Sequence, residues 1–290
     1  MSTPSICYLN GEFLPLENAQ VSVLDRGFIF GDGIYEVIPV YGTNPFRLKE
    51  HLQRLDNSLK AVRMVNPLSD AQWEDMLTKL ISQNSNGDQS VYMQITRGVA
   101  KRDHAFPANT KATVFAMSSP LPSSSKTLAS EGVTAITLDD IRWRYCNIKS
   151  IALLPNILLR QQALDNKAVE AILVREGMVT EGAASNVFIV KNGVIKTPVK
   201  SECLLPGITR DLIVELAVKN KLPCEETEIS EAELLAADEI WLSSSIKEIL
   251  PVTRLNDKTV ADGKPGKVWQ QMQTIFQDYK QRLRDGIEVE

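Results

Sequence analysis

Three short segments of the sequence carry residues that could do chemistry, and the first of them contains a lysine. Lys149 lies in Ile148-Lys149-Ser150, between an apolar and a small residue and just before an apolar helix start. A half-buried lysine loses its proton more readily than an exposed one and can then act as a nucleophile. The alternative is a surface lysine at the end of a strand, because lysines without a partner are usually exposed.

The second segment has the pattern of a phosphate site. Pro206-Gly207-Ile208-Thr209 places a glycine turn in front of an expected helix, and Thr209 adds a hydroxyl. The first turn of a helix has free N–H groups and a positive dipole end, which suits a phosphate. Ser243-Ser244-Ser245 offers further hydroxyl donors after an expected strand. A plain helix start capped by threonine, followed elsewhere by an ordinary turn, would explain the same residues.

The third segment, residues 180–186, joins two expected strands and contains Glu181. A carboxylate there could hold a positively charged group, or it could be an ordinary turn residue. Each of the three segments is a weak signal when taken alone.

The hydrophobic pattern predicts the elements that would position these segments. Apolar residues at spacings of three and four predict helices, and alternating or β-branched runs bounded by turn residues predict strands. The expected strands are 6–9, 12–14, 34–41, 91–97, 112–117, 133–138, 171–175, 187–190 and 239–243. The expected helices are 52–62, 70–81 after the N-cap Ser69, 154–166, 208–220, a short one after the capping box of Ser230 and Glu233, and 267–284. Strands and helices mix without a regular β-α-β order, so an α+β fold is expected.

A Pro- and Ser-rich stretch divides the chain. Residues 118–125 read Ser-Ser-Pro-Leu-Pro-Ser-Ser-Ser and have no periodicity, which is typical of a linker. We therefore expect a small N-terminal domain at 1–118, a linker at 119–125 and a C-terminal domain at 126–290.

Composition excludes several classes of protein. The 290 residues are 43% hydrophobic and 23% charged, as in an ordinary globular protein, and a net charge of -4 argues against nucleic-acid and anionic-membrane partners. Four dispersed cysteines without a CxxC pair, and only two histidines, argue against a disulfide framework and a metal site. No secretory signal or long apolar run is visible, so the expected location is the cytoplasm.

Taken together, the order and spacing of these segments resemble the fold-type IV family of pyridoxal-phosphate enzymes. The family includes branched-chain aminotransferases, D-amino acid aminotransferases and aminodeoxychorismate lyases. The resemblance covers nearly the whole chain, from Tyr-Leu-Asn-Gly at 8–11 and Asp-Arg-Gly-Phe-Ile-Phe-Gly-Asp-Gly-Ile-Tyr-Glu at 25–36 to Ser-Ser-Ser at 243–245. It implies a smaller N-terminal α/β domain, a larger β-barrel-like C-terminal domain with helices, and pyridoxal 5′-phosphate as the cofactor.

The resemblance also implies roles for single residues. Lys149 would be the Schiff-base lysine and would move a proton between the substrate α-carbon and the cofactor. Glu181 would face the pyridine nitrogen, where a carboxylate favours the protonated pyridinium that acts as the electron sink. The residues expected to bind the rest of the cofactor are Arg54, Leu205, Ile208, Thr209, Ser244 and Ser245.

The substrate follows from Lys101-Arg102-Asp103-His104, which resembles the D-amino acid aminotransferase pattern. There, Arg102 and His104 would bind the substrate α-carboxylate and Tyr35 would add a hydroxyl. A solvated basic loop is the alternative. Because this loop reaches the neighbouring subunit's site in the family, the resemblance implies a homodimer with shared active sites. The expected reaction converts D-alanine and 2-oxoglutarate into pyruvate and D-glutamate.

Three residues depart from the family pattern, and other functions stay open. Ala183 and Ala184 stand where close D-amino acid enzymes carry serines, and Ile246 replaces a polar residue. These changes could alter the substrate range. The alternatives are a branched-chain L-amino acid or (R)-amine transaminase, an aminodeoxychorismate lyase, and a non-catalytic protein that binds a phosphate ligand. Lys149 together with Glu181 argues against the last, and Lys247 is the other lysine near the expected site.

Overall fold

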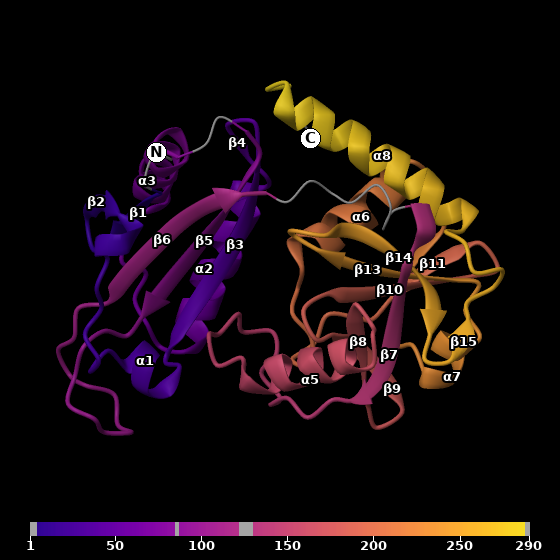
Figure 1. Cartoon of the computed structure of the whole chain (residues 1–290), viewed down its shortest axis with the longest axis horizontal. Helices are drawn as coiled ribbons and strands as arrows, with labels where there is room; N and C mark the ends of the chain where they lie inside the picture. Colours follow the sequence, from indigo (N-terminus) through magenta and orange to yellow (C-terminus); the bar gives the residue numbers. More distant parts are fainter. Residues whose placement is uncertain (1–4, 85–86, 122–129, 288–290) are drawn as a thin grey trace. The chain divides into compact units, whose positions relative to one another are not determined.

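The computed structural model describes residues 5–84, 87–121 and 130–287, which form two compact units (Figure 1). The first unit contains the described residues up to 121 together with 148–152 and 282–287, and the second contains the rest. The sequence assigned both of these later segments to the C-terminal domain, so the units differ from that division. Part of the expected linker at 119–125 lies outside the described residues, and its boundaries stay a prediction.

The first unit is built on an antiparallel sheet, six-stranded within the described residues, with the order β2-β1-β6-β5-β3-β4 (Figure 1). A tight turn joins the first two strands, and both of its residues, Asn10 and Gly11, have positive φ angles of 52° and 106°. The turn confirms the hairpin expected at 6–14. The strands are β1 Ile6–Leu9, β2 Glu12–Pro15, β3 Gly33–Tyr41, β4 Asn44–Pro45, β5 Gln89–Thr96 and β6 Thr113–Pro120.

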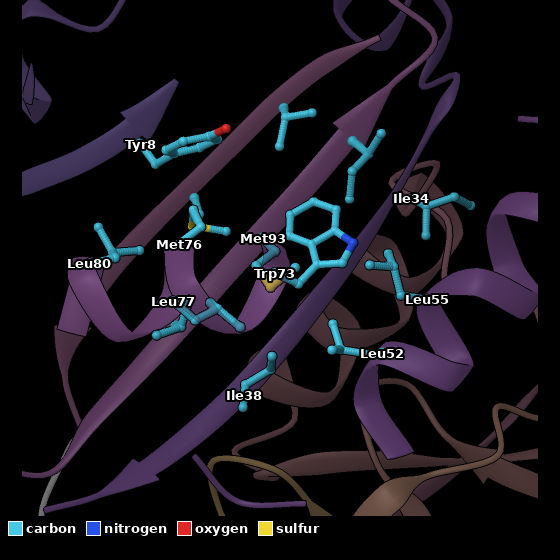
Figure 2. Packing of buried hydrophobic residues seen from close by; sticks show 14 of the residues in the cluster. Tyr8, Ile34, Ile38, Leu52, Leu55, Trp73, Met76, Leu77, Leu80 and Met93 are labelled. Carbon is cyan, nitrogen blue, oxygen red and sulfur yellow. The ribbon is translucent and has the colours of Figure 1, made fainter. Parts of the chain in front are cut away.

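Two helices, α2 (Leu48–Ala61) and α3 (Asp70–Ser82), supply side chains to a hydrophobic core on one face of this sheet. Figure 2 shows Leu52 and Leu55 of α2 and Trp73 of α3 among side chains from the strands. Ser69 is the N-cap of α3, as the sequence predicted, and it also forms a capping box with Gln72. A short helix, α1 (Arg26–Phe30), lies where the sequence predicted neither a helix nor a strand, with Asp25 as its N-cap.

The second unit contains a mixed sheet that is nine-stranded in the part of the chain described. Eight strands follow the order β12-β11-β10-β13-β14-β7-β8-β9, and β15 pairs with β14 (Figure 1). The strands are β7 Val133–Asp139, β8 Glu170–Arg175, β9 Met178–Gly182, β10 Asn186–Lys191, β11 Val194–Thr197, β12 Cys224–Glu226, β13 Glu239–Ser244, β14 Glu248–Leu255 and β15 Lys258–Thr259.

Chain length requires this sheet to curl. Only residues 183–185 connect β9 to β10, although β8, β7, β14 and β13 lie between them in the sheet order. Three residues span roughly 10 Å, whereas five strand spacings measure about 24 Å. The two strands therefore approach each other only if the sheet bends round, which gives the barrel-like domain that the family resemblance implied.

Helices cover parts of this curled sheet. In the second unit, α5 (Leu154–Asp165) packs on β7 and β8, α6 (Ile208–Lys219) on β12 and β13, and α7 (Glu231–Leu235) on β9. Most of the last helix, α8 (Lys267–Arg284), also belongs to this unit. The predicted α+β class is confirmed. Among the described residues, no helix combines the length and the apolar character needed to cross a membrane.

Candidate active site

Lys149 belongs to the first unit. Among the described residues, hydrogen bonds hold its backbone in place, whereas they do not hold its side-chain amine. The Tyr35 N–H donates to the Lys149 carbonyl oxygen at 2.9 Å, and the Lys149 N–H donates to Ser58 Oγ at 3.3 Å. The Lys149 Nζ lies 4.1 Å from the centre of the Tyr35 ring, and no carboxylate among the described residues forms an ion pair with it. Lys149 and Tyr35, both predicted site residues, are therefore brought together.

Arg54 of α2 lies in a buried group of charged residues that includes Glu36 of β3 and His51. Its Nε and Nη2 atoms donate to the two Glu36 oxygens at 2.8 and 2.7 Å, and His51 Nδ1 lies 2.8 Å from Glu36 Oε2. Burial opposes ionisation of Glu36, but the Arg54 guanidinium holds the pKa of that carboxyl well below its usual range. The guanidinium is thus held in one orientation. Its contact with a phosphate stays a prediction.

Arg102 and His104, the predicted carboxylate ligands, both lie against Phe30 of α1. The His104 ring centre is 5.5 Å from that of Phe30, and the Arg102 guanidinium carbon is 5.4 Å from it. Within the described part of one chain, no hydrogen bond, ion pair or ring contact joins Tyr35 to either residue. Both predicted carboxylate ligands therefore lie near the same phenylalanine, and their joint binding of a carboxylate stays a prediction.

Arg26 fixes the backbone of this loop, a role the sequence did not suggest. Its Nη1 donates to the carbonyl oxygens of Asp103 and Ala105 at 2.6 and 3.3 Å, on either side of His104. Asp32 in turn receives Arg26 Nε and Arg97 Nε, each at 2.8 Å. The contact between Arg26 and Asp103 links positions 77 residues apart, so no local pattern in the sequence could have indicated it.

Glu181 is a buried carboxylate of β9 in the second unit, so it is not a turn residue. It accepts hydrogen bonds from the Arg142 guanidinium, from Asn186 Nδ2 at 3.2 Å and from the Leu205 N–H at 3.0 Å. Burial raises the pKa of Glu181 to about 7, and the charge of Arg142 works against that shift. The sequence did not indicate a role for Arg142, and it indicated none for Asn186, although Asn186 ends the segment that contains Glu181.

The start of α6 forms a buried N-terminus without a side-chain cap. Ile208 and Thr209, in its first turn, are only 6% and 3% exposed. A Cβ added at the N-cap Gly207 would lie 1.9 Å from Asn186 Oδ1, so the turn requires glycine. Free N–H groups at a buried helix start are costly unless an anion or another acceptor meets them.

The serine segment lies in the same unit. Ser243 Oγ is buried and has no hydrogen-bond partner among the described residues, while Ser244 Oγ accepts the Lys247 N–H at 3.2 Å. Ser245 is half-buried. A buried hydroxyl that lacks a partner costs free energy, which indicates that a polar ligand belongs nearby.

These second-unit residues fit a phosphorylated pyridine. Glu181 offers a buried carboxylate for a ring nitrogen, and the uncapped start of α6 offers N–H donors for a phosphate. Asn186 connects the two places, because its Nδ2 also donates to the Leu205 carbonyl oxygen at 2.9 Å. Leu205 is therefore held between the carboxylate and the helix start.

Known proteins resemble the chain over almost its full length. The family described as amino-transferase class IV matches residues 33–255. A D-alanine aminotransferase from Bacillus licheniformis is 39% identical over 269 residues, which cover 93% of this chain and 95% of that protein. A D-alanine aminotransferase from Staphylococcus epidermidis is 38% identical over 275 residues, which cover 94% and 97%.

Solved structures with the same fold include branched-chain aminotransferases. That of Escherichia coli has a TM-score of 0.89 at 27% identity and covers 95% of this chain and 94% of its own. That of Thermoproteus uzoniensis, solved with norvaline, has a TM-score of 0.87 at 25% identity and covers 96% and 95%. A third branched-chain enzyme, solved with pyridoxamine 5′-phosphate, has a TM-score of 0.90 at 25% identity and covers 96% and 94%.

Proposed function

The chain belongs to the class IV aminotransferases, and on this premise we propose that it is a D-amino acid aminotransferase with pyridoxal 5′-phosphate as its cofactor. It moves an amino group between D-amino acids, such as D-alanine and D-glutamate, and 2-oxo acids. One observation supports the choice of substrate: Arg102 and His104 each lie against Phe30, on a loop whose backbone Arg26 holds. Identities of 37–39% to D-alanine aminotransferases support the same choice.

Lys149 and Glu181 carry the chemistry in this proposal. The bound cofactor supplies an electron sink for the charge left when the substrate α-carbon loses its proton. Lys149 holds the cofactor covalently and moves the proton at that carbon, which suits an amine that no carboxylate pairs with among the described residues. Glu181 keeps the ring nitrogen protonated, and Arg142 and Asn186 orient it.

In this proposal, two sets of residues supply donors for the phosphate. In the second unit, Ile208 and Thr209 offer N–H groups and a hydroxyl at the buried start of α6, with Ser244 and Ser245 beside them in the proposal. In the first unit, Arg54 offers a guanidinium that Glu36 already orients. Leu205 packs on the ring. A guanidinium fixed in advance loses little entropy when it binds an anion.

The enantiomer that the enzyme accepts depends on where the substrate carboxylate is bound. Arg102, His104 and Tyr35 would bind it, and Lys149 works on one face of the cofactor. With both groups fixed, only one enantiomer can point its α-proton at the lysine. The proposal assigns that geometry to D-amino acids.

We further propose a homodimer with shared active sites, in the cytoplasm. Val23, Phe28 and Phe106 are 69%, 76% and 53% exposed in the first unit. An apolar surface near the carboxylate-binding loop suits burial against a second copy of the chain. The cytoplasm suits four cysteines that are all free, with Cys7 and Cys146 buried.

The runner-up within the family is a branched-chain L-amino acid or (R)-amine transaminase, or an aminodeoxychorismate lyase. The branched-chain enzymes share the fold at 25–27% identity, well below the 39% of the D-alanine enzymes. The presence of both Arg102 and His104 on one anchored loop favours the D-amino acid activity, because an arginine and a histidine together can bind one carboxylate.

The visible absorption of the cofactor-loaded protein tests the proposal. D-alanine should bleach the band of the covalently bound cofactor, L-alanine should leave it, and Lys149→Ala should lack it. Arg102→Ala and His104→Ala should raise the KM for D-alanine. Bleaching by L-amino acids alone would keep the family and overturn the substrate.

A further inference from the structure

A group of charged residues that the proposed reaction does not use lies in the second unit. It consists of Arg160 of α5, Lys247 between β13 and β14, and Glu170 of β8, and we call it the Arg160 cluster. Arg160 forms no hydrogen bond or ion pair with any described residue, and its Nη1 atom is buried. A buried guanidinium N–H without a partner is costly, so it indicates a missing anion.

Lys247 adds a second positive charge to this cluster. Its side chain is half-buried, and its amine has no hydrogen-bond or ion-pair partner in the described part of the chain. Burial lowers the pKa of Lys247; Glu170 opposes that shift and Arg160 adds to it. Among the described residues, neither cation is neutralised by a direct contact.

Glu170 is the carboxylate of the Arg160 cluster, and its charge works against the lowering of the pKa of Lys247. It is 1% exposed, and its oxygens accept the Ala171 N–H at 3.1 Å and the Ser185 hydroxyl at 3.2 Å. Two cations against one carboxylate leave the Arg160 cluster with a net positive charge. A half-buried net charge is stabilised by an anionic ligand.

The Arg160 cluster adjoins both segments that the proposed function places at the cofactor. Asn156, one turn before Arg160 on α5, donates to the Ala183 carbonyl oxygen at 2.8 Å, shortly after Glu181 in the chain. Lys247 follows Ser245 by two residues. An anion bound here would therefore lie beside the cofactor residues of the second unit.

We propose that Arg160 and Lys247 bind the second carboxylate of a dicarboxylic substrate, 2-oxoglutarate or D-glutamate. The inference rests on the proposed function, in which one site must accept both the methyl group of alanine and the longer acidic side chain of glutamate. Arg102 and His104 are occupied by the α-carboxylate in either case. The side-chain carboxylate needs cations of its own, and a lysine on a long flexible stem can serve it without obstructing alanine.

Acceptor selectivity tests the inference. Lys247→Met and Arg160→Met should lower kcat/KM for 2-oxoglutarate by about ten- to a hundredfold and that for pyruvate by less than about threefold, because a charge-assisted contact to one substrate is lost. D-2-aminobutyrate serves as the common amino donor. Lys247→Arg should retain most of the preference. Lys200→Met, at an exposed lysine paired with Asp211 at 2.8 Å, is the matched control and should change neither value.

A binding measurement separates this inference from the proposed function. Calorimetry on the cofactor-loaded protein should show glutarate binding more tightly than butyrate, and Lys247→Met should remove the difference. Equal losses for both acceptors, or unchanged selectivity and unchanged glutarate binding, would overturn the role of the Arg160 cluster while leaving D-amino acid transfer intact. If the wild type fails to use any D-amino acid, the proposed function fails, and glutarate binding still decides whether the anion site exists.

Discussion

The buried carboxyl of Glu181 predicts a pH dependence of stability that Glu181→Gln should remove. In the cofactor-free protein, burial raises the pKa of Glu181 from 4.5 to about 7. Below pH 4.5 the carboxyl is protonated in both the folded and the unfolded state. Between pH 4.5 and about 7 the folded state binds more protons than the unfolded state, so the free energy of unfolding must fall as the pH rises.

The size of the effect follows from the two pKa values. At about 1.4 kcal/mol for each pH unit, raising the pKa from 4.5 to about 7 costs the folded protein about 3 kcal/mol once the pH exceeds 7. A glutamine cannot ionise, so Glu181→Gln carries no such cost. The variant should therefore gain stability relative to the wild type as the pH rises from 4.5 to about 7, and the gain should level off at higher pH.

Urea unfolding of cofactor-free protein, followed by circular dichroism at several pH values between about 4.5 and 8, measures the difference. Subtracting one stability curve from the other removes the contribution of every titrating group whose pKa the substitution leaves unchanged. Arg142→Met provides a second comparison, because loss of the guanidinium should raise the pKa of Glu181 further and extend the slope above pH 7. Bound cofactor should reduce the slope, since a protonated ring nitrogen favours the ionised carboxylate.

Parallel stability curves for wild type and Glu181→Gln across this range would refute the reasoning. They would mean that Arg142, Asn186 and the Leu205 N–H compensate fully for burial and keep the carboxyl ionised without a cofactor. A slope of opposite sign would mean that those donors outweigh burial altogether.

Three further substitutions test the positioning of other groups. Arg26→Met should raise the KM for D-alanine about tenfold in steady-state assays with little change in kcat, because the loop at 103–105 loses its anchor; an unchanged KM would show that the loop holds itself. Glu36→Gln should weaken cofactor binding in fluorescence titrations by about ten- to a hundredfold and cost about 3 kcal/mol of stability, because Arg54 loses its carboxylate. Glu50→Gln is the control, because Glu50 lies on the same helix as Arg54, is only partly buried and pairs with Arg47 instead; equal affinities of the Glu36→Gln variant and the wild type would exclude this role. Ser69→Ala should lower the free energy of unfolding by about 1 kcal/mol in urea without changing activity; no loss would mean that the capping box contributes little.

Local patterns in the sequence predicted those elements whose ends are set by local chemistry. Ser69 accepts the Gln72 N–H at the start of α3, and Ser230 does the same for Glu233 at the start of α7. The predicted terminal helix at 267–284 coincides with α8. In each case the signal lies within one or two turns, so the rest of the fold is not needed to interpret it.

The strand β14 was missed because its signal conflicts with its place in the sheet. Pro251 argues against an interior strand, since proline cannot donate to a neighbouring strand. In the structure, Pro251 lies opposite Trp241 of β13, and pairing with β7 on the other side begins only at Val252. At the proline the strand has a neighbour on one side alone among the described residues, and that arrangement depends on the register of a distant segment.

The same difference between local signals and long-range contacts applies to the candidate site. Lys149, Glu181 and Thr209 could be singled out because each lies in a short segment with a distinctive pattern. The partners that position site residues could not be singled out in this way. Arg142 is 39 residues from Glu181, and Glu36, which orients Arg54, is 18 residues from it on a different element. Their pairing exists only after the sheets have formed.

The two alanines that depart from the family pattern differ in how deeply they are buried. Ala183 is 3% exposed, packs with Leu159 and Ala163 of α5, and donates its N–H to the Ala171 carbonyl oxygen at 3.0 Å. A serine there would bring a hydroxyl into an apolar cluster, so packing explains the alanine without any change at the cofactor. Ala184 is exposed and stands next to Ser185, the partner of Glu170 in the Arg160 cluster. Of the two departures, Ala184 is therefore the one placed to change which side chains the enzyme accepts.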